Sequence, residues 1–369
     1  MGATFGRGFY VLDDYAALRD MAGGALVAGA VLFPVRDAWW YVPNAPLQAP
    51  GQPTLGTTSF VAPNPDFGAT FTYWLADPPT TMREERREAE KAAAERGEDI
   101  AFPGYDRLTA EALENGPRVA MLVRDAAGNP VRRVMGPATR GLHRVTWDLR
   151  RPAPDPVDLT PPGFTPPWAG PSRGPLAPPG DYTVEMALIT ETGTLPLGDT
   201  QPFTVKPVPN IDPTTDFTAA MAFAAETAEL QRRARGAAAE ISRARDRLRH
   251  MRAALDETPK AGPELYQRLE EIEGRLAVLA AELQGDPAPR RLNEPIVPSI
   301  MGRIGQVAGG HWGTRQEPTG TQQASLAIAR EGLGEVAAAL RSLLDGELAA
   351  LERDMEAAGA PWTPGRGVG

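Results

Sequence analysis

Few residues of this sequence have the types and spacing that a catalytic site needs. Asp13 and Asp14 are adjacent carboxylates that directly follow the strand-like run Phe9–Leu12. Glycoside hydrolysis uses two carboxyl groups about 5 to 10 Å apart, so this pair is the one acidic pair that could suit it. Aspartates also end strands and cap helices, and a helix-like segment, residues 15–21, comes next. The sequence favours the structural role and leaves hydrolysis as the alternative.

The histidines carry no pattern of a metal site. His143, His250 and His311 fall in a predicted strand, a long predicted helix and a predicted loop, and the chain has no cysteine. None of the three histidines belongs to an H-x-H or H-E-x-x-H motif, and the sequence has no calcium loop of the D-x-[DN]-x-[DN]-G type. The sequence therefore predicts no metal, no cofactor and no catalytic residue in this chain.

Three other combinations resemble sites only in part. Ser299 and His311 have the residue types of a Ser–His–Asp triad, but no G-x-S-x-G elbow surrounds the serine. The stretch Gly309–Gly313 offers backbone N–H groups to an anion, yet it lacks the Lys-Ser/Thr end of a phosphate loop, so we predict a flexible loop. Asp148 stands two residues before Arg150, and we interpret it as an ion-pair and turn residue.

Composition excludes some classes of partner. The 369 residues are 42% hydrophobic, enough for ordinary cores in two or three domains, and the formal net charge is -9. An acidic chain is poorly suited to a nucleic-acid backbone. No stretch approaches the roughly 20 apolar residues of a membrane span, and the N-terminus has no signal-peptide pattern. The sequence thus predicts neither nucleic-acid binding nor a membrane span, and it leaves the localisation unknown.

Period-two patterns predict an antiparallel β-sandwich over residues 66–210. Phe71, Tyr73 and Leu75 alternate with polar residues, and a Gly-containing turn at Asp125–Gly128 joins two apolar runs into a hairpin. Further strands are predicted at 145–149, 182–188 and 203–205. On the first of these, Trp147 shares a face with Val145 and Leu149.

Two insertions interrupt the predicted sandwich. Residues 80–115 contain a charged helical insertion, which opens with a capping box at Thr81–Glu84 and extends to about Arg96. Residues 151–180 form a proline-rich loop around Trp168. We expect this loop to lie extended over the sandwich, and docking of a polyproline-binding partner is the alternative for Trp168 and the prolines.

Heptad spacing predicts a helical bundle over residues 211–369. Apolar residues recur at steps of three and four, which predicts helices near 215–256, 263–284 and 322–358. In the third helix, the predicted core positions include Leu340 and Leu344. The Gly262-Pro263 turn folds the second helix back on the first, so Leu248 and Leu276 should lie at the same height. Packing within one chain is favoured over dimerisation.

Several segments together resemble a known group of bacterial proteins. GRGFYVLDD, LFPVRDAWWYVP, NPDFGATFTYWLAD, RDAAGNPVRRVMGPATRGLHRVTWDLRRP and PPGDYTVEMAL are similar to the C-terminal region of BNR-type, sortilin-like β-propeller proteins labelled glycosyl hydrolase or sialidase-like. The resemblance implies that residues 1–65 are a remnant of the last propeller blade and a linker. It also implies an Ig-like domain of the flagellar hook-cap type, whose signatures fall at Gly141, Val145, Trp147, Asp148, Pro179, Gly180, Tyr182 and Val184.

The first strand is expected to belong to a sheet outside this chain. Phe9–Leu12 has no evident local partner, and a run near residues 30–33 is the alternative one. The propeller repeat S-x-D-x-G-x-x-W does not occur in this sequence. By the resemblance, the arginines, tyrosine and acid of a sialidase would therefore belong to blades outside this chain.

These observations predict a non-catalytic accessory or interaction region of a larger β-propeller protein, with a spacer and a docking arm. The alternative is the C-terminal part of a glycoside hydrolase whose active site lies in the propeller. A self-standing scaffold is the third hypothesis, if Met1 is the true start. The upstream propeller is the expected partner, and a protein or a glycan stays open as a further one. The resemblance implies that the parent protein is exported.

Overall fold

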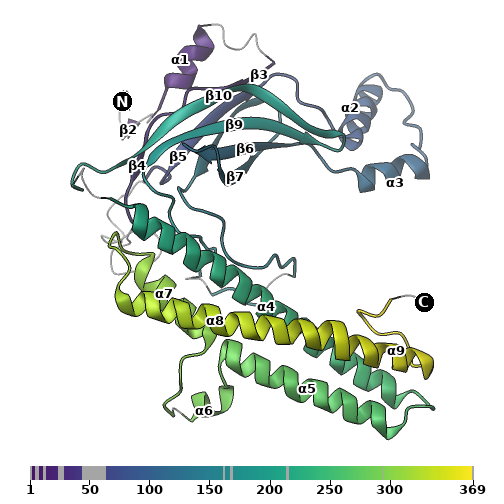
Figure 1. The fold of residues 1–369 in the computed structure, drawn as a ribbon. Helices are drawn as coiled ribbons and strands as arrows, with labels where there is room; N and C mark the ends of the chain where they lie inside the picture. The colour runs from purple at the N-terminus through teal and green to yellow at the C-terminus, as the bar shows by residue number, and fades with distance from the viewer. Residues whose placement is uncertain are drawn as a thin grey trace. The chain divides into compact units, whose positions relative to one another are not determined.

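The computed structural model describes residues 2–4, 8–10, 14–23, 29–43, 64–160, 163–166, 169–212, 216–292 and 294–367. Its contacts divide the chain into two compact units (Figure 1). Met1–Arg151 and Ala177–Thr215 form the first, which contains the described strands and is called the strand unit. Pro152–Leu176 and Asp216–Gly369 form the second, called the helix unit. The fold combines α and β structure, as the sequence predicted.

Two sheets make up most of the strand unit. The five-stranded sheet has the order β4-β10-β9-β6-β7, and the three-stranded sheet has the order β3-β5-β8. Every pairing in them is antiparallel except that of β4 with β10, which is parallel. The strands are β3 (Ala30–Leu32), β4 (Ala38–Trp40), β5 (Ala69–Leu75), β6 (Arg118–Asp125), β7 (Pro130–Gly136), β8 (Gly141–Trp147), β9 (Gly180–Thr190) and β10 (Gly193–Pro207).

Aromatic side chains join the inner faces of the two sheets. Trp147 of β8 meets Tyr182 of β9 with ring centroids 5.3 Å apart, and Phe71 of β5 meets Phe203 of β10 at 5.7 Å. The Trp147 ring is 1% exposed, and its Nε1 donates a hydrogen bond of 2.9 Å to the Arg150 carbonyl. Buried and half-buried residues alternate along β5, as predicted.

Local chemistry sets the hairpin between β6 and β7. One Asp125 carboxylate oxygen accepts hydrogen bonds from the backbone N–H groups of Ala127 and Asn129, at 3.0 and 2.9 Å. Gly128 has a φ of +81°, which costs a residue without a Cβ little. The predicted hairpin is confirmed.

Leu149 departs from the predicted alternation. Strand β8 ends at Trp147, and Leu149 has a left-handed φ of 54° although its side chain is fully buried. Its carbonyl accepts a hydrogen bond of 2.7 Å from the Ala177 N–H. The expected burial is confirmed, but the expected strand geometry is wrong, because the chain turns here to meet a segment distant in sequence.

The first strand has a partner within this chain. Strand β2 (Gly8–Tyr10) pairs antiparallel with β1 (Gly2–Thr4), and β3 pairs with β5. The expectation that the first strand has no partner within this chain is therefore wrong, and so is the alternative that it pairs with residues 30–33, whereas its membership of a sheet outside this chain stays a prediction. Three residues, Gly-Ala-Thr, are too few to show a period of two, so the sequence pattern could not reveal β1.

The charged insertion contains two helices that an arginine joins. Helix α2 (Met82–Glu95) begins with the predicted capping box, whose two hydrogen bonds link Thr81 and Glu84. Helix α3 (Tyr105–Leu113) follows it. The Arg86 guanidinium binds both oxygens of the buried Glu111 carboxylate, at 2.8 and 2.9 Å, and holds the pKa of that carboxyl below its usual value. This bidentate pair links the two helices.

The helix unit is built on long helices. The predicted ranges are confirmed for α4 and α5, and α8 to α9 covers the third range. The helices are α4 (Thr218–Asp256), α5 (Pro263–Gln284), α6 (Pro287–Arg291), α7 (Ile300–His311), α8 (Gly320–Ser342), the π-helical turn η3 (Leu343–Leu348) and α9 (Ala349–Ala357). A short N-terminal helix of the strand unit, α1, spans Ala16–Ala22. Figure 1 shows α5 beside α4 and the C-terminal part of the α8–α9 rod.

Ion pairs reveal the directions of the helices. Arg252 of α4 pairs with Glu273 of α5 at 2.7 Å, and Asp256 accepts a hydrogen bond of 3.2 Å from the Tyr266 hydroxyl. Position numbers rise on one helix as they fall on the other, so α4 and α5 are antiparallel. The pairs Arg330–Glu226 and Arg247–Glu352 rise together, so α4 runs parallel to α8 and α9.

A π-helical turn shifts the apolar stripe of the third helix. Its buried positions follow steps of three and four up to Leu343, and the next buried position is Leu348, five residues on. The predicted core residue Leu344 is only partly buried, because the stripe passes from Leu340 to Leu343, and that prediction is corrected. The extra residue in the η3 turn then places the next buried position at Leu348, which heptad counting does not anticipate.

Most of the proline-rich loop belongs to the helix unit and not to the strand unit. Residues 152–176 belong to the helix unit, and Asp155 forms an ion pair with Arg235 of α4. The sequence placed this loop over the strands. Proline-rich segments have no apolar periodicity that would indicate which surface they cover.

We expect Trp147→Ala to destabilise the strand unit by about 3 to 5 kcal/mol, because it empties the aromatic contact between the sheets. Urea dependence of amide hydrogen exchange in β5 and β8 would measure the loss. The matched control is Trp39→Ala, which removes an exposed tryptophan of the same unit. If the amide hydrogens of β5 and β8 were equally protected from exchange in the two variants, Trp147 would not be a core residue.

We expect cysteines at Leu248 and Leu276 to form a disulfide within one molecule. Both side chains are buried in one core, and the Arg252–Glu273 pair sets a register that brings them level. Oxidation at low protein concentration, read by mass and gel mobility, tests this. The control pairs Leu248→Cys with Val278→Cys, whose side chain is 58% exposed and should not react. Dimers in the first variant would contradict the fold-back.

Candidate binding groove

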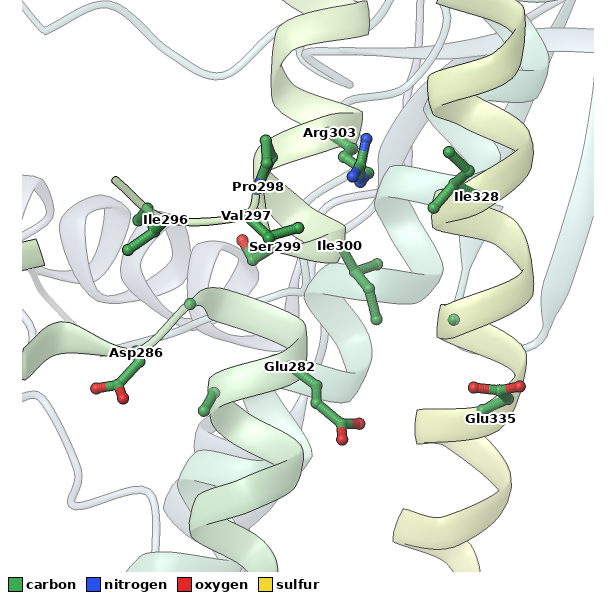
Figure 2. A pocket seen from close by; sticks show the side chains of 13 residues that line it. Glu282, Asp286, Ile296, Val297, Pro298, Ser299, Ile300, Arg303, Ile328 and Glu335 are labelled. Carbon is green, nitrogen blue, oxygen red and sulfur yellow. The ribbon is translucent and has the colours of Figure 1, made fainter. Parts of the chain in front are cut away.

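An open groove of about 510 Å³ lies in the helix unit where α5, α7 and α8 meet. Figure 2 shows its labelled side chains, which come from the end of α5, the approach to α7 and the middle of α8. The lining residues are Ala281, Glu282, Gly285, Asp286, Ile296, Val297, Pro298, Ser299, Ile300, Arg303, Ile328, Gly332 and Glu335. Volumes of this order suit a few side chains of a partner.

Two helix ends shape one wall of the groove. Helix α5 stops at Gly285, which has a φ of +97° and whose N–H donates a hydrogen bond of 2.8 Å to the Ala281 carbonyl. Helix α7 begins after Ser299, whose hydroxyl accepts a hydrogen bond of 3.1 Å from the Gly302 N–H. A Cβ on Gly285 would lie 3.7 Å from the Ser299 side chain, so the two ends adjoin.

A glycine on α8 lets α7 approach. A Cβ at Gly332 would lie 3.3 Å from Ile300 Cδ1, closer than most such contacts. Figure 2 shows Ile300 directed into the space between α7 and α8. The missing side chain therefore gives Ile300 its room and leaves the groove an aliphatic floor.

The rim of the groove is charged and mainly acidic. Figure 2 shows Glu282 and Glu335 on facing helices at one end, and Arg303 at the other end. Within the part of the chain that the structure describes, none of these three forms an ion pair. Asp286 adds a third carboxylate, one oxygen of which accepts a hydrogen bond of 2.8 Å from the Ala288 N–H. Available charges at both ends favour a ligand that carries the opposite charges.

Aliphatic side chains are exposed beside these charges. Val297 is 81% exposed and Ile328 is 52% exposed, and Ile296 is also exposed. Burying such side chains gains roughly 25 cal/mol per Å² of apolar surface. The groove can thus bind a ligand by apolar burial and orient it by charge. Among the residues described, no cluster of three or more His, Asp or Glu could hold a metal ion.

The candidate carboxylates have structural roles where the structure describes them. One Asp14 oxygen accepts a hydrogen bond of 3.0 Å from the Ala16 N–H, which agrees with the predicted turn role; the N-cap of α1 is Tyr15, so Asp14 is not the helix cap. Asp13 lies outside the described residues. Asp148 accepts a hydrogen bond of 3.2 Å from the Arg150 N–H, which confirms its turn role.

The histidines are not brought together. The His143 ring lies 5.1 Å from the Tyr73 ring in the strand unit. His250 contacts the Asp246 carbonyl one turn earlier on α4, and His311 packs on Phe223, near the other end of α4. Residues 223 and 250 are about 40 Å apart along a helix that rises 1.5 Å per residue.

The triad hypothesis fails on geometry. Ser299 and His311 lie at opposite ends of α7, about 18 Å apart. The flexible loop predicted for Gly309–Gly313 is also wrong up to residue 311, since α7 continues through both glycines to His311. Packing of α7 against α4 and α8 outweighs the low helix propensity of glycine. Trp168 lies outside the described residues.

Sequence reasoning missed the groove because it missed α7. A usable signal was present, since Ser299 stands at a capping position before Ile300, Ile304, Val307 and Ala308, which have helical spacing. The glycines of this segment concealed that pattern.

Comparison of the chain with known proteins gives no information about this groove. No protein family, curated protein or solved structure matches the chain. None of the described helices is both long enough and apolar enough to cross a membrane.

His311 is a buried titratable group at the end of α7. Its Nε2 donates a hydrogen bond of 3.2 Å to the Gln316 carbonyl, and its ring centroid lies 5.1 Å from that of Phe223. Nδ1 is buried without a hydrogen-bond partner among the described residues. Burial lowers the pKa of His311, because a charged ring would be poorly solvated here.

We expect the helix unit to lose stability as the pH falls below about 6.5, the ordinary pKa of histidine. In that range the unfolded chain binds a proton at His311 and the folded chain does not. Urea unfolding followed by helical circular dichroism between about pH 5 and 8 measures the slope. His311→Leu should lose this part of the slope, and the exposed control His250→Leu should keep it. Identical slopes in both variants would contradict the burial of a neutral ring.

Proposed function

We propose that this chain is a non-catalytic accessory region of a larger β-propeller protein. The strand unit is its spacer, and the helix unit is a docking arm that binds a polypeptide segment. The groove carries the proposal, because it combines exposed aliphatic side chains with charges that have no partner among the described residues. An open surface of this kind suits binding better than the enclosed chemistry of an active site.

The finer architecture is part of the proposal. Two sheets with apposed aromatic faces support an Ig-like sandwich. Helix α5 runs antiparallel to α4, which supports an antiparallel pair in the bundle, and α8 runs parallel to α4. The β1–β2 pair supports a remnant of the last blade, since propeller blades have four strands and two alone are marginally stable. The remaining strands would come from the upstream propeller.

Charge indicates the kind of segment that the groove binds. Glu282 and Glu335 face the same space from two helices, so a lysine or arginine of the partner would be attracted to that end. Aliphatic side chains beside this residue would cover Ile328 and Val297. The upstream propeller is the proposed source of the segment.

The first test is the reading frame upstream of Met1 together with the mass of the native protein. A frame that continues through a propeller supports the proposal, and a native protein that begins at Met1 contradicts it.

The second test measures binding of the separately expressed propeller to this chain by titration calorimetry. We expect the Glu282→Lys, Glu335→Lys variant to bind at least about tenfold more weakly, equivalent to about 1.4 kcal/mol. The matched control is Glu271→Lys, Glu331→Lys, which makes the same charge change on exposed positions of the same helices. Equal losses in both variants would show that net charge, and not the groove, governs binding.

A further inference from the structure

Two aromatic side chains are exposed on the edge strand β4 and its continuation. Trp39 is 53% exposed and Tyr41 is 40% exposed, whereas Trp40 between them is fully buried. Side chains two residues apart on an extended chain point to the same face, about 6.4 to 6.8 Å apart. The Trp40 carbonyl still accepts a ladder hydrogen bond of 3.2 Å from the Val208 N–H, so the extended pairing continues to this point. Trp39 therefore lies on the face of the five-stranded sheet opposite the buried Trp40, and Tyr41 follows it just beyond the strand.

Neighbouring contacts hold this aromatic pair in place. The Tyr41 ring meets the Phe67 ring edge-on, with centroids 4.7 Å apart. Trp39 lies opposite Lys206 in the parallel pairing of β4 with β10. Lys206 and Asp37 form an ion pair beside the tryptophan. The backbone that carries the two rings is thus held by strand pairing, and the Asp37–Lys206 pair forms a polar border beside them.

The polar border continues across β10 to β9. Asp37 accepts a hydrogen bond of 3.1 Å from the Thr204 N–H, and the Thr204 hydroxyl donates one of 2.8 Å to Asp181. The bond from Lys206 and then that from the Thr204 backbone hold the pKa of Asp37 below its usual value, so this carboxylate stays charged. Donors and acceptors therefore stand in fixed positions next to the aromatic rings.

We propose that Trp39, Tyr41, Asp37, Lys206 and Asp181 form a binding site for a neutral glycan chain. A pyranose ring offers a face of C–H groups that packs on an aromatic ring, and a rim of hydroxyls that both donate and accept hydrogen bonds. The site supplies both kinds of surface side by side. Carboxylates outnumber the ammonium group, which disfavours a polyanion. Among the described strands, β4 lies at the edge of the five-stranded sheet.

Pre-organisation is the second reason for this assignment. The hydrogen bonds among Asp37, Lys206, Thr204 and Asp181 already fix the polar groups, so binding would order few side chains. This matters for a glycan, because each of its hydroxyls exchanges a hydrogen bond with water for one with the protein and gains little binding free energy. A low entropic cost of ordering the site therefore contributes directly to affinity. This inference depends on the strand unit alone and stands apart from the groove of the helix unit.

Affinity electrophoresis of the full chain tests the proposal. The gels contain one soluble neutral polysaccharide each: hydroxyethyl cellulose, arabinoxylan, galactomannan, a mixed-linkage β-glucan, pullulan or dextran. We expect at least one polysaccharide to retard the chain. Trp39→Ala should abolish the retardation, and Trp39→Phe should retain part of it because the ring face remains. The matched control is Trp362→Ala, which removes a 60% exposed tryptophan of the helix unit.

Each outcome decides between the alternatives. Retardation that Trp39→Ala abolishes and Trp362→Ala preserves supports the site. Absence of retardation on all six gels overturns the proposal, and so does retardation that survives Trp39→Ala. Amide hydrogen exchange of the Trp39→Ala variant shows whether its fold is intact, and Lys206→Ala provides a second variant that leaves the rings in place. Loss of binding in that variant supports the polar half of the site, and unchanged binding overturns it.

Discussion

The helix unit depends on covering one continuous apolar stripe along α4. This helix has 39 residues and a length of about 58 Å, and a stripe of that length must be buried over its whole extent. Neither antiparallel partner among the described helices of this unit is long enough. Helix α5, with 22 residues, covers the C-terminal part, and α7, with 12 residues, covers the N-terminal part. The parallel rod of α8 and α9 covers a second side.

This division of the cover explains where the groove lies. One helix must stop and another must begin along the same side of α4, and the end of α5 at Gly285 adjoins the start of α7 at Ser299. Helix ends cannot pack as closely as continuous helices, because their terminal backbone groups need caps and solvent. The groove is thus a consequence of how α4 is covered, and acidic residues lie at one end of it. It takes no residue from the buried core along α4.

The strand unit shows a similar relation between core and surface. Trp147, Tyr182 and Phe203 fill the space between the sheets, so the neighbouring aromatic residues at the edge strand are free to face outward. Trp40 alternates with Trp39 and Tyr41 and is the one of the three that enters the core, where its Nε1 donates a hydrogen bond to the Ala177 carbonyl. Strand periodicity therefore divides one short aromatic run into a structural residue and two surface residues. Exposed tryptophans beside fixed polar groups are more consistent with recognition than with stability.

Local patterns of the sequence determined much of the fold. The capping box at Thr81, the turn at Asp125–Gly128 and the heptads of α4 and α5 each depend on residues near one another in the chain, and each agrees with the structure. Tertiary contacts decided the rest. Helix α7 forms through its glycines because α4 and α8 pack on it, and Leu149 turns left-handed to meet Ala177. Propensity and periodicity are sums over near neighbours, whereas these two features are set by residues far away in sequence. The groove belongs to the second kind, since its lining comes from three helices that only the folded core brings together.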